Sequence, residues 1–142
     1  MKEVEDIERV QKRASKMVKE CSGLKYVDRL KYLKIPCLKY RRFRGDLIMV
    51  YNMMKDGSDV QSFPRLKKTL CTITRGHKFK LQSGKFRNNP RKFFFSNRVV
   101  SVWNELPDVI VEAANVTKFK IMLDNYMTDF DFVYDYKRDI NI

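Results

Sequence analysis

The chain has 142 residues, of which 44% are hydrophobic and 13% aromatic, so it is long and apolar enough to bury a core. Its formal net charge of +13 opposes compaction and indicates a polyanionic partner such as nucleic acid or an anionic membrane surface. The charged N-terminus is unlike a signal peptide, and no apolar run approaches the ~20 residues that a membrane span needs.

Apolar residues at helical spacing predict three helices in the first 55 residues. Over residues 3–20 they form one stripe, with most of the basic side chains turned away from it. The stripe consists of Val4, Ile7, Val10, Ala14, Met17 or Val18, and Cys21. A short helix is expected over 26–34, ended by Pro36, and the longest helix over 37–55.

The pattern changes in the middle of the chain. Residues 69–82 alternate between apolar and polar, which predicts two short strands, and Arg75-Gly76 could form the hairpin turn between them. The flanking stretches 57–66 and 83–92 are rich in Gly, Pro, Ser and Asn and are expected to be loops.

Two further helices are predicted near the C-terminus. Ser96 or Asn97 can cap a helix over 97–106, and Asn115 can cap the last helix. The buried stripe of the first of these helices is expected to contain Val99, Val100, Trp103 and Leu106. The predicted fold class is therefore mainly α, with a small β-hairpin element in the middle.

We expect one domain over residues 1–142, made of four consecutive parts. They are a helical part (1–56), a basic hairpin and loop region (57–92), C-terminal helices (93–127) and an acidic tail expected to fray (128–142). Residues 61–104 hold 11 Lys/Arg and no Asp or Glu, whereas residues 105–142 hold 4 Lys/Arg and 8 Asp/Glu. A single charged run is usually a solvated face, but one of this length bordered by aromatic residues predicts a contact surface.

The residues that catalysis requires are scarce. His77 is the only histidine, the three cysteines are widely spaced, and no glycine-rich phosphate loop or adjacent pair of aspartates is present. We therefore expect no catalysis by this chain on its own, no metal and no cofactor. Widely spaced cysteines also suit reduced thiols, which predicts an intracellular protein, nuclear or cytoplasmic and not secreted.

Several stretches, in order, carry a resemblance to a known family. They are IERVQKRASKMV, RLKYLKIPCLKYRRFRGDLIMVYNMM, TRGHKFKL, RNNPRKFFFSNRVVSVWNELP and VTKFKIMLD. Over roughly residues 5–125 the chain resembles the C-terminal part of a non-LTR retrotransposon reverse transcriptase of the jockey-like, endonuclease-bearing kind (a LINE-type transposable element). The most specific pieces lie at 41–48, 74–81 and 94–107.

The resemblance implies a helical thumb and the basic region after it, without the polymerase palm, its paired catalytic aspartates or the endonuclease. The Cys/His zinc knuckle found after the thumb in some relatives is missing here. The chain would then be a truncated, decayed or retained remnant of an RNA-directed DNA polymerase, with no polymerase activity of its own. The helices would form a thumb-like bundle.

A thumb holds a duplex by its phosphate backbone whatever the base sequence, which calls for Lys and Arg on a helical scaffold. The expected partner is RNA, an RNA–DNA hybrid or DNA. The candidate contacts are Arg41, Arg42, Arg44, Arg75, Lys78, Lys80, Arg87, Arg91 and Lys92. Phe93 and His77 are candidates for stacking on bases, although a structural histidine in a turn and a hydrophobic anchor are the alternatives.

Two other functions stay open at this stage. The chain could be a protein-interaction module that docks onto a missing reverse-transcriptase palm or associates with itself, or it could be a non-functional decayed fragment. Attachment to a membrane surface is a weaker alternative, because the basic residues are not gathered on one amphipathic helix.

Overall fold

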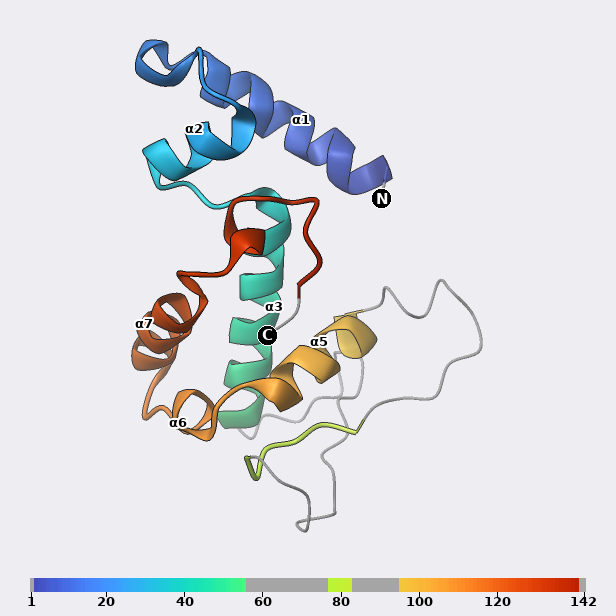
Figure 1. The fold of residues 1–142 in the computed structure, drawn as a ribbon. Coiled ribbons are helices and arrows are strands. Elements are labelled where there is room, and N and C mark those ends of the chain that lie inside the picture. The colour runs from blue at the N-terminus through green and yellow to red at the C-terminus, as the bar shows by residue number, and fades with distance from the viewer. Residues whose placement is uncertain (1, 56–76, 83–94, 141–142) are drawn as a thin grey trace. The chain divides into compact units, whose positions relative to one another are not determined.

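The structure is a computed structural model that describes residues 2–55, 77–82 and 95–140. These residues are mainly helical, which confirms the predicted class (Figure 1). The α-helices are α1 (Lys2–Lys16), α2 (Tyr26–Leu33), α3 (Leu38–Lys55), α5 (Phe95–Glu105), α6 (Asp108–Val111) and α7 (Val116–Met127). Two short 3-10 helices, η1 (Lys19–Cys21) and η3 (Asp131–Val133), accompany them.

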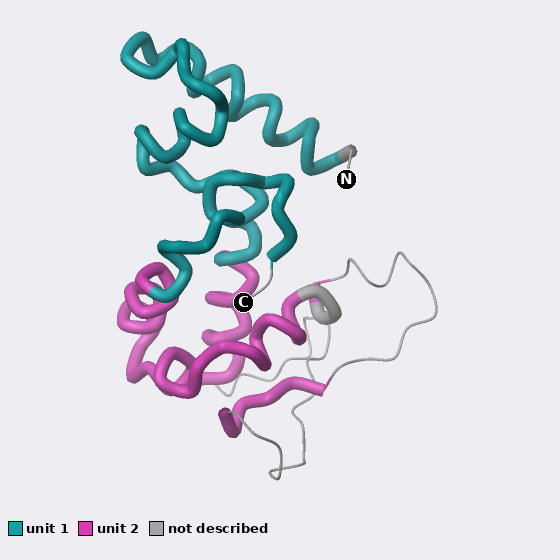
Figure 2. The backbone as a smooth tube through the Cα atoms, viewed as in Figure 1, with its two compact units in different colours: residues 1–44, 126–140 teal, residues 45–125, 141–142 magenta. Residues whose placement is uncertain are grey.

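The chain packs as two compact units (Figure 2). The first consists of residues 1–44 and 126–140, and the second of residues 45–125 and 141–142. The four consecutive parts expected from the sequence are therefore not the units of packing, because the first unit joins the start of the chain to residues 126–140. Helices α3 and α7 each contribute residues to both units.

The first unit has a small core of aromatic and sulfur-containing side chains. Tyr40, Phe43 and Phe132 are all buried, with ring centroids 6.2–6.4 Å apart. The buried side chains Cys21, Leu30, Cys37, Met127, Val133 and Tyr136 complete it.

Helix α1 packs with its polar side inward, which differs from the expected apolar stripe. Glu8 is fully buried and Ser15 is 6% exposed, whereas Ile7, Val10 and Met17 are 56%, 68% and 83% exposed. The predicted helix is present, but only Cys21, in η1, is buried among the residues assigned to the stripe. Hydrogen bonds determine which side of α1 faces the first unit, and the spacing of apolar residues in the sequence cannot reveal these bonds.

The buried Glu8 carboxylate caps the N-terminus of α3. Its Oε1 accepts hydrogen bonds from the backbone N–H groups of Leu38 at 2.7 Å and Lys39 at 3.4 Å. The Tyr26 hydroxyl donates to Oε2 at 2.5 Å. A helix leaves its first N–H groups without partners inside the helix, and an anion at that end also suits the helix dipole. Glu8 thus caps the first two N–H groups of α3, and the Sγ of Cys37, next to the helix, accepts from the Tyr40 N–H at 3.4 Å.

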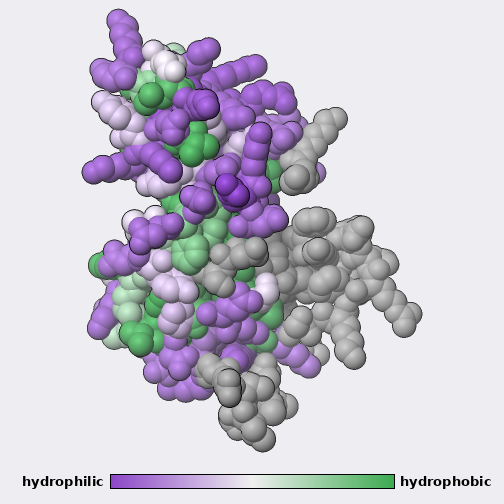
Figure 3. Space-filling view, viewed as in Figure 1, coloured by the Kyte–Doolittle hydropathy of each residue, from purple (hydrophilic) through white to green (hydrophobic). Residues whose placement is uncertain are grey.

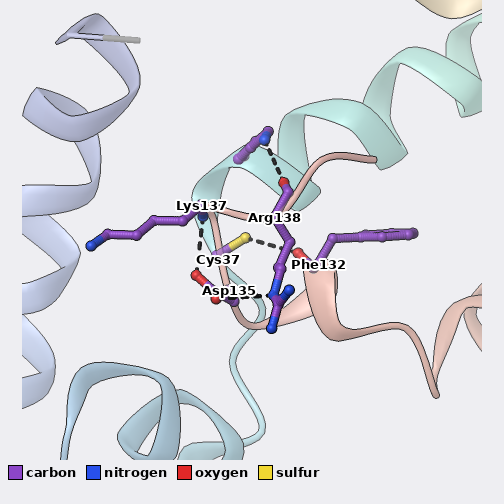
Figure 4. A network of polar contacts seen from close by, with 6 residues as sticks. Cys37, Phe132, Asp135, Lys137 and Arg138 are labelled. Atoms are coloured by element: carbon purple, nitrogen blue, oxygen red, sulfur yellow. Dashed lines mark hydrogen bonds and ion pairs between the residues drawn. The ribbon is translucent and has the colours of Figure 1, made fainter. Parts of the chain in front are cut away.

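The predicted fraying of the acidic tail is wrong for residues 128–140. Phe132, Val133 and Tyr136 are buried, and the Cys37 backbone N–H donates to the Val133 carbonyl at 2.9 Å. Figure 4 shows the polar contacts at this place, where the Cys37 thiol donates to the Phe132 carbonyl at 3.4 Å and Asp135 contacts Lys137 and Arg138. The apolar and aromatic residues interleaved with the acids explain why this segment packs.

The second unit is built around stacked aromatic rings. Tyr51 of α3 and Phe119 of α7 stack with centroids 4.3 Å apart, and Trp103 of α5 lies 6.2 Å from Phe119. The Tyr51 hydroxyl donates to the Ala113 carbonyl at 2.6 Å. Val99, Val100, Trp103 and Leu106 are all buried, so the stripe predicted for this helix is confirmed.

Near the end of the second unit, the predicted cap of the last helix is present, together with a short helix that was not predicted. Asn115 Oδ1 accepts from the Lys118 backbone N–H at 2.8 Å, which confirms Asn115 as the cap of α7. The short helix α6, which follows Pro107, was not predicted. A helix of one turn has too few residues to show a periodicity.

The β-hairpin expected around Arg75-Gly76 is not supported. Residues 77–82 contain a turn and a single bridge residue, Leu81, and no strand is present in the described parts of the chain. Residues 69–76 and the predicted loops 57–66 and 83–92 lie outside the described residues.

Alkaline pH is expected to destabilise the first unit. Burial, followed by the hydrogen bond to Glu8, raises the pKa of Tyr26 well above its ordinary value, and burial raises the pKa of the Cys37 thiol from 9.0 to about 11. Both groups stay protonated to higher pH in the folded state than in the unfolded state. Their contribution to the free energy of unfolding is therefore complete below pH ~9 and is lost as the pH rises through the folded-state pKa values.

Urea unfolding at a series of pH values between ~8 and ~11 measures this loss. We expect the free energy of unfolding to fall across that range, and Tyr26→Phe to make the fall shallower. The matched control is Tyr32→Phe, which alters a tyrosine that is 60% exposed and should leave the pH dependence unchanged. An alkaline profile that is identical in all three proteins contradicts the assignment to Tyr26.

Candidate nucleic-acid interface

The described segment 77–82 lies inside the basic stretch 61–104 and is held against α5 by side chains of that helix. Asn104 makes two hydrogen bonds to the backbone of Leu81: its Oδ1 accepts from the N–H and its Nδ2 donates to the carbonyl, both at 2.8 Å. Trp103 Nε1 donates to the Phe79 carbonyl at 2.9 Å. The Asn104 amide thus satisfies the Leu81 backbone as a neighbouring strand would.

His77 belongs to the same attachment. Its side chain is 3% exposed, its Nε2–H donates to the Trp103 carbonyl at 2.8 Å, and its ring meets the indole edge-on with centroids 5.8 Å apart. His77 Nδ1 is buried without a hydrogen-bond partner. The stacking role predicted for His77 is therefore wrong, and the structural alternative holds.

Lys78 and Lys80 are the members of the candidate set on this segment. The Lys78 side chain is 68% exposed, and its Nζ lies 3.2 Å from Glu112 Oε1, whose side chain is 47% exposed. An exposed pair of this kind contributes only about 0–1 kcal/mol, so Lys78 can exchange Glu112 for a phosphate at little cost. Lys80 is half-buried and interacts within the protein.

Arg41, Arg42 and Arg44 lie on α3 within the first unit. Arg41 and Arg42 are exposed, whereas Arg44 is half-buried and interacts within the protein. Figure 3 shows that hydrophilic side chains cover most of the visible surface of this unit. Arg41 and Arg42 are therefore the members of this group with accessible side chains.

The remaining candidates lie outside the described residues. They are Arg75, Arg87, Arg91, Lys92 and Phe93. Within the basic stretch 61–104, only Lys78 and Lys80 have basic side chains that the structure describes, and these lie together on the segment held by α5.

The residues that hold the segment were not predicted from the sequence. Asn104 follows Trp103 and gave no signal of its own, because a polar residue beside a buried stripe is ordinary on a helix. A single aromatic residue followed by an amide does not reveal which part of the backbone these two side chains will contact.

The described residues contain no group of three or more His, Cys, Asp or Glu that could hold a metal ion. Within the same ranges, no helix has the length and apolarity of a membrane span.

Comparison with protein-family models, with curated proteins and with solved structures finds no match to the chain. The resemblance to non-LTR retrotransposon reverse transcriptases thus stays a prediction that rests on the motifs of the sequence.

Proposed function

We propose that the chain binds RNA, an RNA–DNA hybrid or DNA by the phosphate backbone, and that it is a remnant of the thumb and post-palm part of a non-LTR retrotransposon reverse transcriptase. In this proposal it has no polymerase activity of its own. Specificity for a base sequence is not expected, because phosphate contacts carry no sequence information.

The observation that carries the proposal is that part of a basic stretch without Asp or Glu is held against α5 by buried or half-buried side chains. Residues 61–104 contain 11 Lys/Arg and no Asp or Glu, and the described segment within that stretch is fixed to α5 by Asn104, Trp103 and His77. Fixed points on a helical scaffold reduce the conformational entropy lost when cationic side chains bind an extended polyanion.

A salt titration tests the proposal. Binding of the purified chain to an RNA–DNA hybrid, to double-stranded DNA and to single-stranded RNA is measured by fluorescence anisotropy between ~50 and ~200 mM salt, where each phosphate contact contributes about 0.9 to the log–log slope. We expect Arg87→Ala, Arg91→Ala and Lys92→Ala together to reduce the slope by about 2–3 and to weaken binding to all three ligands.

The matched control removes the same number of positive charges from the first unit. Lys16, Lys19 and Lys31 are exposed, and their triple change to alanine is expected to alter the slope by less than about 1. An equal loss in both triple variants means that only net charge matters and contradicts a localised grip. Absence of binding at the lowest salt concentration contradicts the proposed function as a whole.

A further inference from the structure

Helix α3 belongs to both units, and a glycine lies where it passes from one to the other (Figure 2). The division falls between Arg44 and Gly45, inside a helix that is continuous from Leu38 to Lys55. Gly45 is exposed, and a Cβ atom at this position would have no atom of the described chain within 4 Å. The packing of the described residues therefore gives no reason for a residue without a side chain here.

The side chains of α3 enter different cores on the two sides of Gly45. Phe43 is buried, and its ring centroid lies 6.4 Å from that of Phe132 in the first unit. Tyr51 is buried and stacks on Phe119 in the second unit, with centroids 4.3 Å apart. Each half of α3 is thus held by its own core, and the backbone at residue 45 joins the two halves.

A glycine inside a helix makes bending easier at that point. Glycine loses more conformational freedom on folding than any other residue, which makes the helical state about fivefold less favourable at Gly than at Ala. The helical hydrogen bonds that span residue 45 are donated by the N–H groups of residues 45–49. A bend at Gly45 opens these bonds to water without removing Phe43 or Tyr51 from its core.

The chain also crosses between the units at the end of α7. Asn125 is the last residue of this helix in the second unit, and Tyr126 belongs to the first. Helix α7 ends at Met127, so the crossing lies in its last turn, where the carbonyl groups lack partners inside the helix and the helix frays most easily. These two crossings therefore both lie where a helix yields at low cost.

We propose that Gly45 is a hinge about which the two units change their relative orientation, while the last turn of α7 yields at the same time. A hinge consists of a few residues that absorb a change of backbone dihedral angles between bodies that stay rigid. Units within one chain are expected to move relative to each other unless a large apolar interface joins them. The inference does not rest on nucleic-acid binding and needs no residue of the basic stretch.

Residual dipolar couplings of the backbone N–H groups test the hinge in the full chain. An alignment tensor is fitted separately to each unit, and units that move relative to each other give tensors of different magnitude. We expect different magnitudes in the unchanged protein. In Gly45→Ala the magnitudes should converge, because alanine makes the bent state about fivefold rarer. The variant is expected to fold, since alanine favours the helix.

Two substitutions serve as controls. Gly23→Ala makes the same change at an exposed glycine of the first unit, where a Cβ atom also has open space among the described residues. Asn52→Gly places a glycine at an exposed position of α3 inside the second unit. Neither position lies between the units, so the two tensors should differ in both controls as they do in the unchanged protein.

Hydrogen exchange distinguishes a hinge from a purely local effect on helix stability. Gly45→Ala should slow the exchange of the N–H groups of residues 46–49 about fivefold, whether or not the units move. Only a hinge connects this slower exchange with convergence of the two alignment tensors.

Three results overturn the inference. They are equal tensors in the unchanged protein, tensors that still differ in Gly45→Ala although exchange at residues 46–49 is slower, and convergence of the tensors to the same extent in Gly23→Ala. None of these measurements involves nucleic acid. The hinge and the proposed function therefore fail separately.

Discussion

Replacing Trp103 with alanine is expected to lower the free energy of unfolding by about 3–5 kcal/mol, the usual range for deleting a buried aromatic side chain. Trp103 is fully buried, contacts Phe119 and His77, and donates from Nε1 to the Phe79 carbonyl. The substitution therefore removes the centre of the second unit and one of the bonds that hold segment 77–82. Urea unfolding monitored by circular dichroism measures the loss.

Two further variants separate the contributions of Trp103. Trp103→Phe keeps an aromatic ring but leaves the Phe79 carbonyl without its donor, so we expect a smaller loss of about 1–3 kcal/mol. Ser101→Ala changes an exposed residue of the same helix and should alter stability by less than about 0.5 kcal/mol. A loss below about 1 kcal/mol for Trp103→Ala would show that the indole is not the anchor of this unit.

Replacing Glu8 with alanine is expected to cost about 2–4 kcal/mol, because the Leu38 N–H and the Tyr26 hydroxyl then lose their acceptor inside the protein. Glu8 is fully buried and serves two elements at once, α2 and α3. The loss should appear as unfolding of the first unit at a lower urea concentration.

Glu5 supplies the control for Glu8. It lies on the same helix, is exposed, and its change to alanine removes the same charge, so a loss of less than about 0.5 kcal/mol is expected. Glu8→Gln keeps an oxygen acceptor without the charge and should fall between the two. Equal stability of Glu8→Ala and Glu5→Ala contradicts the capping role of Glu8.

The elements of the fold could be predicted from the sequence where periodicity is long or capping is local. The helices over 26–33 and 38–55 and the stripe ending at Leu106 follow from apolar spacing, and Asn115 from its position before the last helix. Tertiary hydrogen bonds decided what periodicity could not. The hydrogen bonds of Glu8 hold the polar side of α1 inward. Cys37 forms hydrogen bonds with the carbonyls of residues 132 and 133, which lie nearly a hundred positions further along the chain.

The candidate site was less predictable. A count of charges located the basic stretch, but it could not show that Asn104 and Trp103 fix residues 79–81 or that His77 is buried among them. Those contacts join residues more than twenty positions apart, and no local pattern encodes them. The ion pair between Lys78 and Glu112 could not be predicted either, because it depends on the path of the chain after α5.

The central claim is that the chain binds the phosphate backbone of nucleic acid. It predicts an affinity that falls steeply with salt concentration and does not depend on the base sequence. The most direct measurement compares two RNA–DNA hybrids of equal length and unrelated sequence, each titrated between ~50 and ~200 mM salt. We expect dissociation constants that agree within about twofold and log–log slopes of at least about 3 in magnitude for both hybrids. Absence of binding at ~50 mM salt, or affinity that depends on sequence and ignores salt, contradicts the claim.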